Sequence, residues 1–252
     1  MKKLYLDIET APNIVYTWGL FNQNVSIDKI IQSGHTLCWA AKWDDQEDVF
    51  FSSVFDDGED VMVNQIWQLL NEADAVVHYN GRRFDMPILN KEFIKHGLEP
   101  PVPYQQIDLL ETARSRFKFT SNKLDYVSQF LGLESKLQHK GMSLWTGCMD
   151  GDPEAWAIMR EYNIQDVRLL PKLYHTLLPW INNHPNVSLY KDDEEIRCTN
   201  CGSVHIKKNG IEHLKTQSYQ RYKCTECGTP LRGRSTINSV DKRKATLTQS
   251  KL

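Results

Sequence analysis

Five side chains in three separated parts of the chain have types and a spacing that suit divalent-metal chemistry. Asp7 and Glu9 stand two apart at the end of the apolar stretch KKLYLDIE, so in a β-strand both carboxylates leave the same face. Asp85 follows a turn after ADAVVHYN, and Tyr162 and Asp166 stand four apart in a segment with helical spacing. If that helix packs across the first strand, four carboxylates without matching basic residues meet. Such an oxygen-rich environment binds Mg²⁺ or Mn²⁺.

These features also have simpler explanations. The acidic pair at the strand end could be exposed, and Asp85 could be the N-cap of the next helix. A further acid at a strand end, Asp108, is expected to cap a helix rather than to bind a metal. Trp18 and Phe21 could stack on bases, but so close to the first strand we expect them to pack in the core.

Four cysteines near the C-terminus form two C-x-x-C pairs, CTNC and CTEC, with 22 residues between them. This spacing predicts a zinc ribbon built on two β-hairpins, with one structural Zn²⁺ held by four thiolates. The expected ligands are Cys198, Cys201, Cys224 and Cys227. Cys38, in an apolar strand, and Cys148, in a predicted loop, have no such partner pattern.

The elements that must position the acids are those of an α/β domain over residues 1–183. Strands are expected at 2–9, 35–43, 48–55 and 73–80, and a helix is expected to run from Pro153, interrupted or kinked at Pro171 and ended at Pro179. Residues 184–195 have the composition of a linker, 196–237 would form the zinc ribbon, and 238–252 are expected to be a disordered basic tail.

The net charge of −2 conceals two halves of opposite sign. Residues 1–185 carry 17 Lys and Arg against 25 Asp and Glu, whereas residues 186–252 carry 13 against 7. The acidic half argues against a broad duplex-binding surface, and the basic half suggests a nucleic-acid contact. The sequence shows no signal peptide and no membrane-spanning stretch, so we expect a soluble cytoplasmic protein.

The three acidic motifs, in this order, resemble those of the DEDD superfamily of 3′–5′ exonucleases, which share a ribonuclease H-like fold. DIET resembles the first motif, NGRRFD the second and YNIQD the third. KLDYVSQFLGLESK is less closely similar to the helix and lysine that precede the third motif in the family. Glu161 stands where the sister subfamily has histidine, so the chain is similar to the tyrosine branch, which includes the proofreading domains of family B polymerases. The resemblance covers about residues 1–180.

The resemblance implies a two-metal mechanism with Mg²⁺ or Mn²⁺. Asp7 would bridge the two ions, Glu9 and Asp166 would bind the first, Asp85 would hold the second, and Tyr162 would orient the attacking water. It also implies contacts with the terminal nucleotide: Thr10 would touch the 3′-OH, and Asn80 and Phe84 would line the nucleotide.

We therefore expect a metal-dependent 3′–5′ exonuclease that acts on single-stranded nucleic acid with a free 3′ end, DNA favoured, and releases nucleoside 5′-monophosphates. An exoribonuclease, a structure-specific nuclease and a non-catalytic nucleic-acid-binding protein stay open as alternatives. Residues 196–237 carry eight Lys and Arg against two acids, with tyrosines interleaved. This ribbon is expected to bind nucleic acid or to dock a replication or repair protein.

Overall fold

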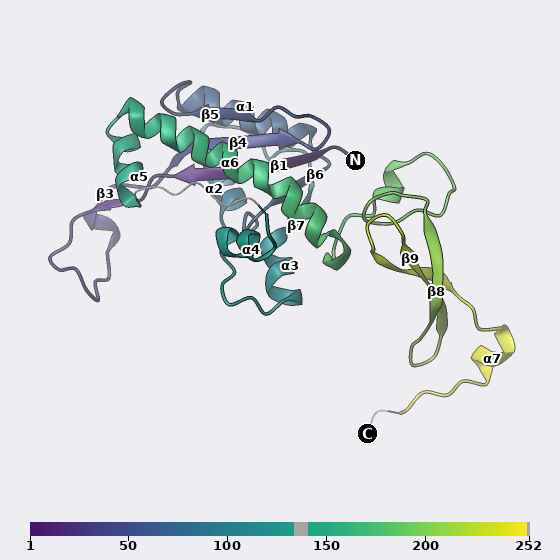
Figure 1. Cartoon of the computed structure of the whole chain (residues 1–252). Helices are drawn as coiled ribbons and strands as arrows, with labels where there is room; N and C mark the ends of the chain where they lie inside the picture. Colours follow the sequence, from purple (N-terminus) through teal and green to yellow (C-terminus); the bar gives the residue numbers. More distant parts are fainter. Residues whose placement is uncertain (134–140, 251–252) are drawn as a thin grey trace. The chain divides into compact units, whose positions relative to one another are not determined.

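The computed structural model describes residues 1–133 and 141–250, and they form two compact units, Met1–Tyr174 and His175–Leu252 (Figure 1). The domain boundaries expected from the sequence stay predictions. No helix within the described residues is long and apolar enough to cross a membrane.

The first unit is built on a five-stranded mixed sheet. Its strand order is β5-β4-β1-β6-β7; β1 pairs with β4 antiparallel and with β6 in parallel. The strands are β1 (Lys3–Thr10), β4 (Thr36–Trp43), β5 (Phe50–Ser53), β6 (Ala75–His78) and β7 (Gln105–Asp108). Helices flank this sheet, so the predicted α/β fold class is confirmed.

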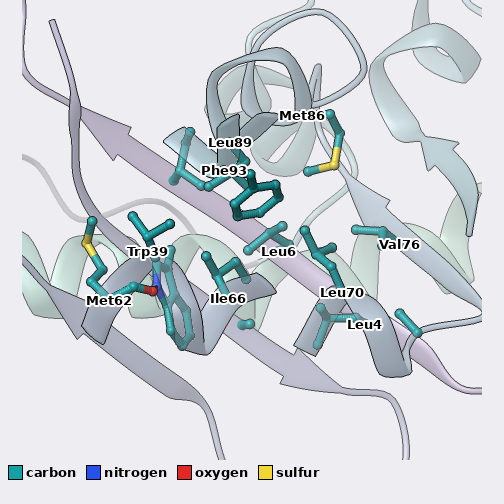
Figure 2. Close-up of a cluster of buried hydrophobic side chains, with 14 of the residues drawn as sticks. Leu4, Leu6, Trp39, Met62, Ile66, Leu70, Val76, Met86, Leu89 and Phe93 are labelled. Atoms are coloured by element: carbon teal, nitrogen blue, oxygen red, sulfur yellow. The ribbon is translucent and has the colours of Figure 1, made fainter. Parts of the chain in front are cut away.

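Strand β1 divides its side chains between two layers, because successive residues of a strand point to opposite faces. Leu4, Leu6 and Ile8 join the core beneath α1 (Glu59–Glu72) and α2 (Asp85–Lys95), which Figure 2 shows packed over the strand. Tyr5 is on the other face and meets Tyr174 of α6 (Pro153–Leu177) edge-on, with ring centroids 6.0 Å apart. Asp7 and Glu9 therefore share the face that α6 covers.

Helix α6 runs without interruption through Pro171. The expected interruption at Pro171 does not occur, because the helix continues to Leu177 and a 3₁₀ turn containing Pro179 (Leu178–Trp180) follows it. Leu170 and Leu173, on either side of the proline, are at most 1% exposed. Their packing offsets the single backbone hydrogen bond that proline cannot donate.

The β2–β3 hairpin (Ile14–Val15 and Ile30–Gln32) and the helix α5 (Met142–Met149) were not expected from the sequence. The loop of this hairpin, which includes the 3₁₀ turn Ile27–Lys29, carries Trp18 (97% exposed) and Phe21 (83% exposed), so the expected core packing of both is wrong. Cys148 lies in α5 rather than in a loop and is buried. The remaining helices of this unit are α3 (Leu109–Arg116) and α4 (Leu124–Phe130).

The second unit contains a three-stranded antiparallel sheet in the order β10-β9-β8. Its strands are β8 (Ile206–His213), β9 (Ser218–Cys224) and β10 (Pro230–Thr236), preceded by the 3₁₀ turn Val187–Tyr190. Residues Val240–Lys244 of the expected tail form the short helix α7.

Substitution of Leu70 tests the packing of α1 on the sheet, because the Leu70 side chain is fully buried in the cluster of Figure 2. Leu70→Ala should lower the free energy of unfolding by about 2–5 kcal/mol, since it removes buried methyl groups and leaves a cavity. The exposed Val61 on the same helix supplies the control, and Val61→Ala should change it by less than about 0.5 kcal/mol. Urea unfolding measures both, and equal effects would contradict the packing described.

Candidate active site

Asp7 and Glu9 lie at the end of β1, on the face that α6 covers. Their partners on β4 are Ala40 and Cys38, and the register shifts immediately after Glu9. Such irregularities are common beside functional sites, because they change the direction of the side chains that follow. The residue after the shift, Thr10, is half-buried at the strand end.

Helix α6 brings a third carboxylate to this pair. Ligand oxygens of Asp7, Glu9 and Asp166 all lie within 4.8 Å of one another, and Asp166 is only 2% exposed. Three carboxylates in so small a space repel one another unless a cation or protons neutralise them. The structure thus brings together three of the four acids expected from the sequence.

Asn163, which the sequence analysis missed, orients Asp7. It is fully buried on α6, and its Nδ2 donates to Asp7 Oδ2 at 2.8 Å and to the Asp7 carbonyl at 3.3 Å. The Cys38 thiol donates to Asn163 Oδ1 at 3.8 Å. Burial, followed by the negative charges of Glu9 and Asp7, raises the pKa of Cys38, so the thiol stays protonated and can donate. This chain of contacts fixes the rotamer of Asp7.

Asp85 approaches the same strand from α2. Its Oδ1 accepts a hydrogen bond from the backbone N–H of Ile8 at 3.1 Å, between the two acids of β1. It is not the N-cap of α2, a position that Phe84 occupies, and it lies outside the three-carboxylate group. Burial raises the pKa of Asp85 to about 7, against the lowering effect of the Ile8 hydrogen bond. A bound cation would favour its ionised form.

Asp108 holds the turn that precedes Asp85. Its Oδ1 accepts from the backbone N–H of Leu110 at 3.0 Å, which confirms the expected helix cap, and from that of Asn80 at 2.9 Å. Its Oδ2 accepts from the N–H of Arg82 at 3.4 Å. One carboxylate therefore ties the start of α3 to the turn and keeps Asn80 at a φ of 73°.

Close packing fixes the next residue of the turn. A Cβ at Gly81 would lie 2.4 Å from the His78 ring, and the Gly81 N–H donates to His78 Nδ1 at 3.1 Å. Burial lowers the pKa of His78, with Asp108 acting in the opposite direction, so the imidazole stays neutral and accepts this bond. The turn is thus held from both sides before the chain reaches Phe84 and Asp85.

Two of the expected site residues are aromatic, and they differ in exposure. Tyr162 is 8% exposed and packs edge-on against Trp145 of α5, with ring centroids 6.1 Å apart. Phe84 is 42% exposed. Tyr162 is therefore fixed by packing one helical turn from Asp166, whereas Phe84 offers an accessible ring. Lys136, the lysine of the less closely similar stretch KLDYVSQFLGLESK, lies outside the described residues.

The four cysteines of the second unit converge as expected. Their sulfurs all lie within 4.8 Å of one another, with Cys198 and Cys227 3.6 Å apart and Cys201 and Cys224 also 3.6 Å apart. Four sulfurs at about 2.3 Å from a tetrahedral zinc would be separated by a similar distance. The cluster is consistent with a zinc ribbon.

Glycines complete the two knuckles that carry these cysteines. Gly202 and Gly228 follow the two pairs with φ of 76° and 80°, values that favour glycine. Their N–H groups donate to the Cys198 and Cys224 carbonyls at 2.9 and 3.2 Å.

Comparison with known proteins establishes the family. The RNase H superfamily matches residues 4–178, and the chain belongs to this superfamily. No curated protein shows significant sequence similarity to the chain. A solved structure that resembles it is the family B DNA polymerase from the hyperthermophilic archaeon Pyrobaculum calidifontis, with 21% sequence identity and a TM-score of 0.52. The match covers 71% of this chain and 24% of the polymerase, so the chain corresponds to about a quarter of that enzyme. Membership of the superfamily supports a nuclease, and the structural similarity supports the fold.

Asn163 provides a test of the site that does not depend on catalysis. Asn163→Ala removes the hydrogen bonds that orient Asp7, and loss of such a supporting group weakens metal binding by about 10–100-fold. Titration with Mn²⁺, followed by electron paramagnetic resonance, measures the affinity. Asn90→Ala, an exposed asparagine on α2, should leave the affinity unchanged. Wild-type affinity in Asn163→Ala would show that Asp7 needs no such support.

Proposed function

We propose that the chain is a metal-dependent 3′–5′ exonuclease that hydrolyses single-stranded nucleic acid, DNA favoured, and releases nucleoside 5′-monophosphates. The proposal rests on one observation. The carboxylate oxygens of Asp7, Glu9 and Asp166 lie within 4.8 Å of one another, in a chain that belongs to the RNase H superfamily. A pocket that only binds nucleic acid gains nothing from carboxylates that repel phosphate. Metal-assisted hydrolysis explains why they are assembled.

The donor set fits Mg²⁺ or Mn²⁺, since it consists of carboxylate oxygens. Asp7 would be shared between two ions, Glu9 and Asp166 would complete the first site, and Asp85, hydrogen-bonded to Ile8, would serve the second. When bound, the two ions supply an activated water and neutralise charge on the phosphate.

Two residues of α6 would orient the reacting groups. Tyr162 is one helical turn from Asp166 and would place its hydroxyl against the attacking water, and Asn163 keeps Asp7 in position. Thr10, at the end of β1, would contact the terminal 3′-OH, and Asn80 and the accessible ring of Phe84 would line the terminal nucleotide. The 3′–5′ direction rests on the three-motif resemblance. The similarity to a DNA polymerase favours DNA over RNA.

The ribbon would hold one structural Zn²⁺ through its four cysteines and contact the substrate strand through its sheet. Lys207 is directly opposite Lys223, and Arg221 is opposite Arg232, whose guanidinium also pairs with Glu212 at 3.5 Å. Since Lys223 and Arg221 are two apart on β9, all four cations share one face. Like charges in direct register destabilise a sheet, and a polyanion relieves that repulsion. A replication or repair protein with an acidic surface is the alternative partner.

Replacement of one metal ligand tests the activity. Asp166→Asn keeps the shape but removes a charged ligand, so cleavage should fall roughly a thousandfold, equivalent to about 4 kcal/mol of barrier. The assay uses single-stranded DNA and RNA with a 5′ label, in Mg²⁺, Mn²⁺ or EDTA. Wild type and the exposed-acid control Asp150→Asn should shorten the strand stepwise with the label retained. Full activity in folded Asp166→Asn, or release of the label as a mononucleotide, would overturn the proposal.

Removal of zinc tests the ribbon. Cys201→Ser should abolish zinc binding and expose the amides of β8–β10 to hydrogen exchange, because so small a unit has little core of its own. The amides of β1 and β4 should keep their protection. Glu226→Gln lies within the second cysteine pair and should retain the zinc. If β8–β10 stay protected after zinc is lost, the metal is not structural.

A further inference from the structure

A small cavity adjoins the turn that leads to Asp85. It has a volume of about 260 Å³, and Asn80 and Arg83 of the turn line it together with Arg114 and Ser115 of α3. It lies within the first unit and contains none of the acids of the β1–α6 group.

The two arginines of this cavity are exposed and available. Within the described parts of the chain, no carboxylate lies within ion-pair distance of the Arg83 or the Arg114 guanidinium. The neighbouring Arg82, by contrast, pairs with Glu111 at 3.3 Å and donates to the Gln106 carbonyl at 3.0 Å. Two such guanidinium groups on one cavity form a site for an anion, because each offers several donors in a planar fork.

The two acids that also line the cavity are already engaged. Asp108 accepts hydrogen bonds from three backbone N–H groups and is 6% exposed, and Glu111 is the partner of Arg82. Since Arg82 pairs with Glu111, two arginines face the single remaining carboxylate of Asp108, and the net charge of the cavity is positive, although the half of the chain to which it belongs is acidic.

The chain continues this positive charge beyond the cavity. Residues 114–123 contain four basic residues and no acid. Their aromatic side chains form a cluster in which Phe117 stacks on Phe119 at 5.2 Å and Phe119 meets Phe130, itself 66% exposed, at 5.3 Å. Basic residues interleaved with accessible aromatic rings are typical of surfaces that follow a single strand.

Hydrogen bonds connect this segment to the candidate active site. The Tyr79 hydroxyl donates to the Asn122 carbonyl at 2.7 Å, and Asp108 joins α3 to the turn of Asn80. The cavity is thus held at a fixed place at Asn80, in the turn that leads to Phe84. A strand whose last nucleotide rests on these two residues would pass its next phosphates over the cavity.

We propose that Arg83 and Arg114 bind a phosphate group of the nucleic-acid strand next to its terminal nucleotide, and that residues 114–123 continue the path of that strand. The inference rests on the proposed function, because it takes a nucleic-acid strand as the ligand. It adds a phosphate site, within the catalytic unit, that is independent of the ribbon.

The test measures binding rather than cleavage. Full-length, zinc-loaded protein is titrated with fluorescein-labelled oligothymidylate of about twelve nucleotides in Ca²⁺, and fluorescence anisotropy gives Kd across a range of salt concentrations. Arg83→Gln/Arg114→Gln should raise Kd roughly ten- to hundredfold, since each hydrogen bond removed involves a charged group. The slope of log Kd against log salt should decrease by about 0.7 for each phosphate that the protein no longer neutralises.

Two control proteins separate charge from structure. Arg83→Lys/Arg114→Lys keeps both charges and should keep the salt slope. Lys2→Gln/Arg168→Gln removes two charges that are paired elsewhere, with Glu72 and Glu161, and should bind as wild type does. Because Arg114 is also in the last turn of α3, where a cation favours the helix, Tm is recorded for every variant.

A Kd and a salt slope equal to wild type in Arg83→Gln/Arg114→Gln would overturn the inference, and so would equal effects of the control pair. Cleavage in Mg²⁺ is assayed separately. Wild-type protein that binds through the arginines but does not cleave would refute the proposed function and leave the phosphate site standing.

Discussion

The rest of the site depends on the packing of α6 against β1. Alternation along the strand places Asp7 and Glu9 on the face opposite the core of Leu4, Leu6 and Ile8, and α6 covers that face with Asn163 and Asp166. Packing of this kind normally buries apolar groups. Here it gathers three carboxylates within 4.8 Å, at an electrostatic cost that only a cation or protonation can offset. The aromatic contact of Tyr5 with Tyr174 helps to hold the helix in place despite this repulsion.

Contacts from outside the group fix two of the four acids, Asp7 and Asp85. Asn163 binds Asp7, the Ile8 amide binds Asp85, and Asp108 holds the turn from which Asp85 begins α2. Each contact uses a buried polar group, and buried polar groups stabilise a fold only when they are paired. Asp7 and Asp85 are therefore held in place by the protein itself, which would reduce the reorganisation that binding of a metal requires.

Much of this arrangement could be predicted from local patterns. The period of two in KKLYLDIE placed both acids on one face, and the spacing of four placed Tyr162 beside Asp166. The two C-x-x-C pairs predicted the convergence of four sulfurs. Asn163 could not be found in this way, because a single asparagine in a helical segment has no periodic signal and its role appears only when α6 meets β1. The exposure of Trp18 and Phe21 was missed because nothing in the sequence indicated that a hairpin would carry them away from the core. The four basic residues of 114–123 were likewise missed, because the charge was counted over the whole acidic half of the chain.

In the proposed mechanism, the carboxylates of β1, α2 and α6 form a two-metal centre. Anomalous diffraction from crystals of the full-length protein soaked in Mn²⁺ tests it most directly. We expect two anomalous peaks, about 3.5–4 Å apart, with Asp7 between them, Glu9 and Asp166 at one peak and Asp85 at the other. Crystals in which Mn²⁺ occupies other sites, or in which these four acids are ordered without any peak between them, would contradict it.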